Sequence, residues 1–245
     1  MERKSFLKSL FVGAISAPAV LAACSKDDSE AASPTGSGST SGGTTSGGTS
    51  SGSCTVAPTE TEGPFPTKVP SSYVRSDIRD DRTGYKLTAT ITITNSNASC
   101  AALAGALVDI WHCDKEGNYS EYGGSGMQST NYQSVHFLRG RQTTNASGQV
   151  QFTTIFPGWY SGRATHIHVH VYSATGTSLK VTQIAFPEGT GTAVAAVNGY
   201  SKGMSGYTYN AQDNVFSDGV TQELATVTGN TTDGFQLNIS FAVPA

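Results

Sequence analysis

The chain has 245 residues, of which 37 % are hydrophobic and only 13 % are charged, and its formal net charge is −3. This length suits one or two domains, and β-sandwiches of this size are often single domains. The weakly acidic balance offers no basic surface for a phosphate backbone, which argues against nucleic-acid binding. No apolar run reaches the roughly 18 residues that a membrane-spanning helix needs. Abundant Gly, Ser and Thr favour short strands and turns over helices.

The first 23 residues have the pattern of an export signal. Arg3, Lys4 and Lys8 form a positive segment, and residues 10–23 are apolar or small but too few to span a membrane. Residues 21–24, Leu-Ala-Ala-Cys, resemble the lipobox of bacterial lipoproteins, so we predict that Cys24 is lipidated. The alternative is an ordinary cleavage site that precedes a cysteine by chance. We expect an exported protein anchored by lipid to a bacterial membrane, with the outer membrane or cell surface as candidate locations.

Residues 24–53 are predicted to form a flexible tether. From residue 29 onward this segment is almost entirely Ser, Gly, Thr and Ala, which cannot bury enough apolar surface to offset the entropy of an ordered chain. The folded domain is therefore expected over residues 54–245.

This domain carries the patterns of an all-β fold. Apolar and polar residues alternate over residues 87–94 and 235–243, as in half-buried strands. Turn signals such as Ser147-Gly148 separate the other strands, which we predict over residues 107–113, 149–155, 166–172 and 179–186. No long amphipathic helix stands out. The prediction is an antiparallel β-sandwich with long active-site loops.

Three cysteines remain after Cys24. An exported protein can form a disulfide, and Cys54 with Cys100 is the favoured pair, although sequence alone does not fix connectivity. Cys113 lies in an apolar stretch and is predicted to be a buried thiol.

Three histidines alternate with apolar residues over residues 166–172. Since side chains of a strand alternate between its faces, His166, His168 and His170 share one face and the apolar residues share the other. Two imidazoles spaced two residues apart can bind one metal ion. A solvated polar face on an edge strand is the alternative. His170 lies farther along the strand, so a supporting or surface role is favoured for it.

The order of motifs along the chain resembles that of the intradiol ring-cleavage dioxygenases, the family of catechol and protocatechuate dioxygenases. The resemblance extends from Pro58 to the C-terminus. It is carried by Thr61-Glu62-Gly63-Pro64-Phe65, by Asp114-x-x-Gly117-x-Tyr119, by Phe137-Leu138-Arg139-Gly140, by Pro157-Gly158-Trp159-Tyr160, by Arg163-x-x-His166-x-His168 and by Thr182-Gln183.

The resemblance implies a mononuclear non-haem Fe(III) site with Tyr119, Tyr160, His166 and His168 as ligands. It also implies catalytic roles for Arg163 and Gln183 beside the substrate ring, and for Tyr160 as a phenolate that leaves the metal and accepts a substrate proton. The expected substrates are a catechol and O2. The expected product is a cis,cis-muconate-type diacid, formed by cleavage between the two hydroxylated carbons.

Two alternatives compete with this interpretation. One is a zinc or copper protein that uses His166, His168 and His170. The other is a surface binding module without ring-cleavage activity, since β-sandwiches serve many functions. The lipid anchor and the lack of helical elaborations also differ from the well-known cytoplasmic members of the family.

Overall fold

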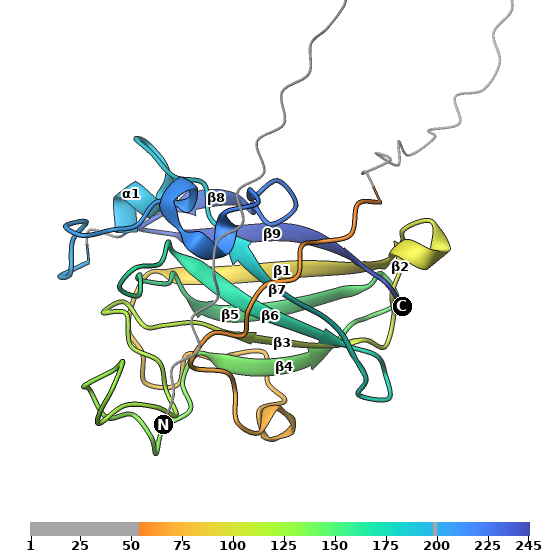
Figure 1. Ribbon diagram of the computed structural model, residues 1–245, viewed down its shortest axis with the longest axis horizontal. Coiled ribbons are helices and arrows are strands. Elements are labelled where there is room, and N and C mark those ends of the chain that lie inside the picture. The colour runs from red at the N-terminus through yellow and green to blue at the C-terminus, as the bar shows by residue number, and fades with distance from the viewer. Residues whose placement is uncertain (1–53, 198–199) are drawn as a thin grey trace, which may run out of the picture. The chain divides into compact units, whose positions relative to one another are not determined.

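The computed structural model describes residues 54–197 and 200–245, in which most regular structure is β-strand (Figure 1). The predicted signal segment over residues 1–23, the lipidation of Cys24 and the tether over residues 24–53 lie outside the described residues. No helix among the described residues is long and apolar enough to cross a membrane.

The first sheet has five strands, and the first and last long strands of the domain pair at its centre. β1 and β9 run parallel, whereas the other pairs of this sheet are antiparallel. The strand order is β2-β1-β9-β8, and β5 also pairs with β1. The strands are β1 (Lys86–Asn95), β2 (Ala101–Ala102), β5 (Gln149–Ile155), β8 (Thr226–Asn230) and β9 (Gly234–Val243).

The second sheet is wholly antiparallel, in the order β4-β3-β6-β7. Its strands are β3 (Leu107–Trp111), β4 (Arg139–Thr143), β6 (His166–Tyr172) and β7 (Ser178–Ala185). The connections contain helix α1 (Ala193–Val197) and the 3-10 turns η1 (Pro70–Ser72), η2 (Ser96–Ala98), η3 (Asn210–Gln212) and η4 (Asn214–Phe216).

The predicted all-β sandwich is confirmed, with one correction. The pair β1–β9 is parallel, and parallel strands need a long crossover, which the chain between them supplies. The apolar residues of both sheets meet in one core, as alternation predicts. Fully buried members include Leu87, Ile91, Leu237, Ile110, Ile167 and Val169.

The histidines of β6 lie on the face of the second sheet that points away from this core. β6 is a central strand between β3 and β7, and loop residues Gly63 and Tyr119 lie against its outer face. His166, His168 and His170 are only 2 %, 3 % and 8 % exposed. The alternative of a solvated face on an edge strand is therefore wrong.

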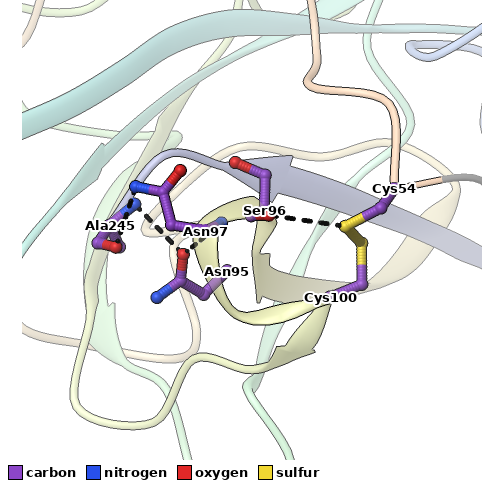
Figure 2. Close-up of a disulfide and its surroundings, with 6 residues drawn as sticks. All are labelled: Cys54, Asn95, Ser96, Asn97, Cys100 and Ala245. Carbon is purple, nitrogen blue, oxygen red and sulfur yellow. Dashed lines mark hydrogen bonds between the residues drawn. A yellow bond between two sulfur atoms is a disulfide. The ribbon is translucent and has the colours of Figure 1, made fainter.

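A disulfide joins Cys54, at the start of the described domain, to Cys100 in the turn between β1 and β2 (Figure 2). This is the pair that the sequence favours, and Cys113 is a buried free thiol just beyond the end of β3. The same turn is tied to the C-terminal residue, since Asn97 Nδ2 donates to the Ala245 carbonyl and the Ala245 amide donates to Asn95 Oδ1.

Candidate metal centre

Three potential ligand atoms meet on the outer face of the second sheet. Tyr119 Oη lies 3.1 Å from His166 Nε2 and 3.4 Å from His168 Nε2, and the two Nε2 atoms are 3.2 Å apart. The histidines come from β6, and Tyr119 comes from the long connection between β3 and β4. All three side chains are buried.

The spacing and protonation of the three atoms fit a shared metal ion. Two donors at right angles, each about 2.1 Å from one ion, lie about 3 Å apart. His166 Nδ1 lies 2.6 Å from the Ala164 carbonyl. A carbonyl only accepts, so Nδ1 carries the proton and the lone pair of Nε2 faces the other two donors. Burial lowers the pKa of His166 to about 3 and that of His168 well below its usual range, so both rings are neutral ligands at pH 7.

Tyr119 needs a nearby cation to ionise. Burial raises the pKa of its phenol well above the ordinary value, and Arg163 and Arg139 offset this only in part. A bound metal ion reverses such a balance because it is the largest local charge. A phenolate with two imidazoles is a donor set suited to a hard, oxidised iron ion.

Short turns and close backbone contacts position Tyr119. Asp114 Oδ1 accepts from the amides of Glu116 at 3.0 Å and Asn118 at 2.9 Å. Gly117 has φ +88°, and a Cβ there would lie 2.3 Å from the Trp159 carbonyl oxygen. The glycine therefore lets this turn pack directly against the segment that carries Tyr160, which is a physical reason for the Asp114-x-x-Gly117-x-Tyr119 spacing.

Aromatic side chains and one glycine close the site. Trp111 stacks on His168 with ring centroids 4.8 Å apart, and Phe65 stacks on Tyr119 at 4.9 Å. Gly63 has φ +67°, and a Cβ there would lie 3.2 Å from His168 Cε1. The segment that contains Gly63 and Phe65 therefore covers His168 and Tyr119 on the side that faces away from the sheet.

The hydroxyl of Tyr160 does not join the three donors. Its ring is part of the same aromatic group, with centroids 6.1 Å from Tyr119 and 5.4 Å from Phe65. Its Oη donates to the Met127 carbonyl at 3.0 Å, and burial raises the pKa of the phenol.

Arg163 and Gln183 lie together beside the histidines. Arg163 Nη2 donates to Gln183 Oε1 at 2.6 Å, and Gln183 Nε2 donates to the Thr61 carbonyl at 2.9 Å. Gln183 is also the partner of His168 in the β6–β7 ladder. The two residues are thus rigidly placed at the edge of the three-donor group.

His170 is directed away from this group. Its Nδ1 lies 2.9 Å from Glu62 Oε1 and 2.9 Å from Tyr172 Oη, and its Nε2 lies 2.7 Å from Ser178 Oγ. Within the described ranges, no three His, Cys, Asp or Glu residues form a group able to hold a metal ion. The three-histidine zinc or copper site is therefore wrong in its geometry.

Comparison with known proteins identifies the family of the chain. A family model described as Dioxygenase matches residues 66–214, more than half of the chain. The chain belongs to the intradiol ring-cleavage dioxygenase family. It is 27 % identical over 143 residues to catechol 1,2-dioxygenase 1 of Acinetobacter lwoffii, a match that covers 50 % of this chain and 44 % of that protein. The chain thus spans less than half the length of the curated relatives it matches.

Two solved structures extend the comparison to the fold. An intradiol ring-cleavage dioxygenase from Tetranychus urticae matches with a TM-score of 0.69 and 29 % identity, covering 78 % of this chain and 95 % of that one. The dioxygenase domain of a carbohydrate-binding fusion from Streptomyces sp. SirexAA-E matches with a TM-score of 0.55 and 25 % identity, over 78 % and 99 % of the two chains. Both alignments cover nearly all of the other chain, so the described domain is similar to complete domains of the family.

Three buried polar residues that surround the site were not predicted from the sequence. Asp213 accepts from Arg163 Nε at 2.9 Å and from the Ala164 amide at 2.8 Å, and it thereby fixes the backbone that orients His166. Arg139 and Gln128 contact the backbone around Tyr119. Arg139 stands inside a quoted motif, but nothing in the sequence marks Asp213 or Gln128, because their roles depend on loops that meet only in the folded chain.

Proposed function

We propose that this protein is a mononuclear non-haem Fe(III) dioxygenase that uses O2 to cleave catechol-type rings between the two hydroxylated carbons, giving a cis,cis-muconate-type diacid. The observation that carries the proposal is the meeting of Tyr119 Oη with the Nε2 atoms of His166 and His168 in a buried site of a chain from this family. Fe(III) bound there would supply Lewis acidity toward both catechol oxygens.

Tyr160 is the proposed fourth ligand and the proton acceptor for a substrate hydroxyl. Its ring packs beside Tyr119, and its hydroxyl donates to the Met127 carbonyl. That hydrogen bond supports the proton-accepting role, because it gives the neutral phenol a partner away from the other three donors. The proton taken from the substrate would be held at Tyr160 Oη.

Arg163 is proposed to stabilise negative charge on the substrate ring. Asp213 binds its Nε and Gln183 binds its Nη2, so the guanidinium is oriented before substrate arrives. Such preorganised charge is most effective in a site that excludes water. The stacking of Phe65 and Trp111 on the ligand rings supports that exclusion.

The direct test is an absorption spectrum of the purified protein before and after addition of catechol, with iron quantified in the same sample. We expect a visible tyrosinate-to-Fe(III) charge-transfer band that changes on catechol binding, together with O2 uptake and formation of the muconate-type product. His168→Ala should abolish all three. A colourless protein with stoichiometric zinc would contradict the proposal, and iron binding without turnover would favour the non-enzymatic binding module.

We also propose that the protein is exported and tethered to a membrane through a lipid on Cys24. The disulfide between Cys54 and Cys100 supports an oxidising compartment, and the lipobox-like residues 21–24 support the anchor. Metabolic labelling with a radioactive fatty acid should mark the wild-type chain, and Cys24→Ser should remove the label. A labelled Cys24→Ser protein would refute the anchor at this residue.

A further inference from the structure

We propose that Gln128 is a positioning residue for the metal centre, which fixes the Tyr119 phenol against the two imidazoles and places the Met127 carbonyl that receives the Tyr160 hydroxyl. This inference rests on the proposed iron site. The hydrogen bonds of Gln128 all go to backbone groups and none reaches the three donor atoms, so it would act through the tyrosines.

The carboxamide of Gln128 binds both backbone groups of Tyr119. The Tyr119 amide donates to Gln128 Oε1 at 2.7 Å, and Gln128 Nε2 lies 2.9 Å from the Tyr119 carbonyl oxygen. This is the pairing that a neighbouring β-strand would supply, but here one side chain supplies it to a residue in a loop. The partners also fix the orientation of the amide, since its oxygen must face a donor and its nitrogen must face acceptors.

The same nitrogen joins three separate points of the loop. Gln128 Nε2 also lies 3.1 Å from the carbonyl oxygens of Tyr122 and Thr130. The side chain is only 5 % exposed, so loss of these bonds would leave buried carbonyl groups without that donor. Gly123 permits the tight fold, because a Cβ there would lie 1.8 Å from the Thr130 carbonyl oxygen.

The residue before Gln128 contacts the other tyrosine. The Met127 carbonyl accepts the hydroxyl of Tyr160 at 3.0 Å, although the Met127 side chain itself is exposed. The two adjacent residues thus hold both phenols: Gln128 through its side chain, and Met127 through its backbone. A shift of this segment would move the Tyr119 phenol and the partner of Tyr160 together.

Gln133 provides a matched control. It is a glutamine in the same loop, and its Nε2 also donates to a backbone carbonyl, that of Gly123, at 2.7 Å, but its side chain is exposed. Gln128→Met and Gln133→Met therefore remove the same chemical group from the same loop, and only the first removes it from the Tyr119 backbone.

The test compares iron-loaded wild-type protein with both variants. For Gln128→Met we expect iron affinity, measured by competition with a chelator, to fall about 10- to 100-fold, as for other residues that support metal ligands. We also expect the tyrosinate charge-transfer band to shift and weaken, whereas Gln133→Met should match the wild type. Unchanged iron affinity and band in folded Gln128→Met would overturn the proposal, even if its melting temperature falls, because stability alone would then depend on Gln128.

Hydrogen exchange of the metal-free proteins tests the contact without iron. In Gln128→Met the amides of residues 119–122 should exchange faster, while those of residues 166–172 keep the wild-type rate. Equal exchange over residues 119–122 would overturn the proposal. If Gln128→Met does not fold, Gln128→Glu replaces it in the iron test, since it keeps the acceptor for the Tyr119 amide and loses the donor to the three carbonyls. Weaker iron binding with a weaker band is then expected, and wild-type values would overturn the proposal.

Measurements on the wild-type protein distinguish failure of the proposed iron site from failure of the role proposed for Gln128. If it binds no iron and shows no visible band, the proposed function fails. If it binds iron with the band, and Gln128→Met does so equally well, only the role of Gln128 fails.

Discussion

The two halves of the candidate site are held in different ways. His166 and His168 lie on β6, whose backbone is hydrogen-bonded to β3 on one side and β7 on the other. Tyr119 and Tyr160 lie in loops, where side chains such as Gln128 and Arg139 supply the missing backbone partners. The strand half therefore depends on the sheet, and the loop half depends on a few buried polar residues.

This difference explains what the sequence could predict. A two-residue period is visible without any structure, so residues 166–172 predict that the β6 histidines share one face, and they suggest that two of them could bind a metal ion. Loop geometry has no period, and Tyr119 was found only through a family resemblance. The hydroxyl of Tyr160 points to the Met127 carbonyl, a contact that no spacing in the sequence indicates.

The same limit applies to the fold. Strands β1, β3, β5, β6, β7 and β9 were predicted, but β2, β4 and β8 were not. The sequence of β4, Arg-Gly-Arg-Gln-Thr, has no apolar alternation. Its arginines instead pair with buried partners, such as Arg141 with Asp109. The parallel pairing of β1 with β9 joins residues far apart in the chain, and local pattern does not encode such long-range pairing.

The largest effect is expected from the strand half. His168→Ala removes one of the two neutral nitrogen donors that the sheet holds in place, and no group of three or more His, Cys, Asp or Glu residues in the described part of the chain could hold the ion instead. We expect catechol turnover to fall by more than about 100-fold, beyond the range for residues that only support a ligand. Steady-state O2 uptake with iron analysis of the same sample measures it. Full iron occupancy and wild-type turnover in this variant would show that His168 of β6 is not a metal ligand.

The loop half should be most sensitive to loss of Arg139. This side chain is 1 % exposed, donates to the carbonyls of Ser120 at 2.6 Å and Phe65 at 2.9 Å, and lies 3.5 Å from the Glu121 carboxylate. Arg139→Met leaves that carboxylate buried without its cation, which costs about 3–5 kcal/mol in the free energy of unfolding.

Urea denaturation measures this cost, and Arg79→Met is the matched control. Arg79 and Asp77 form an exposed pair, worth less than about 1 kcal/mol. If Arg139→Met costs no more than Arg79→Met, the buried ion pair does not stabilise the loop half.

The disulfide belongs to neither half of the site. Its loss should therefore lower the stability of the domain without changing iron binding. It closes a loop between residues 46 positions apart, near the turn after β1. Replacing both cysteines, Cys54→Ser with Cys100→Ser, should lower the free energy of unfolding by about 2–4 kcal/mol. The iron affinity and the charge-transfer band should stay at wild-type values, and a change in either would connect this turn to the site.

The last predictions concern pH, because each half contains one buried glutamate and their pKa values move in opposite directions. Near β7, burial raises the pKa of Glu223 to about 7, and Glu60 and Asp218 add to the rise. In the loop half, burial alone would raise the pKa of Glu121, but the Lys68 amide and Arg139 hold it below its usual range.

The signs of the two stability effects follow from these shifts. A raised carboxyl pKa means that Glu223 contributes its full stability below its unfolded pKa and loses it as pH rises toward 7. A lowered pKa means that the contribution of Glu121 is present at neutral pH and is lost as the solution becomes acidic. Each group changes the free energy of unfolding by at most about 1.4 kcal/mol per pH unit.

Urea denaturation as a function of pH separates the two glutamates. Glu223→Gln should flatten the loss of stability between about pH 4.5 and 7, since it removes the group whose pKa is raised to about 7. Glu121→Gln should instead flatten the loss below pH 4.5, because the group with the lowered pKa is gone. If both variants change the free energy of unfolding over the same pH range, the two glutamates do not titrate independently. The difference between the strand half and the loop half would then not extend to their electrostatics.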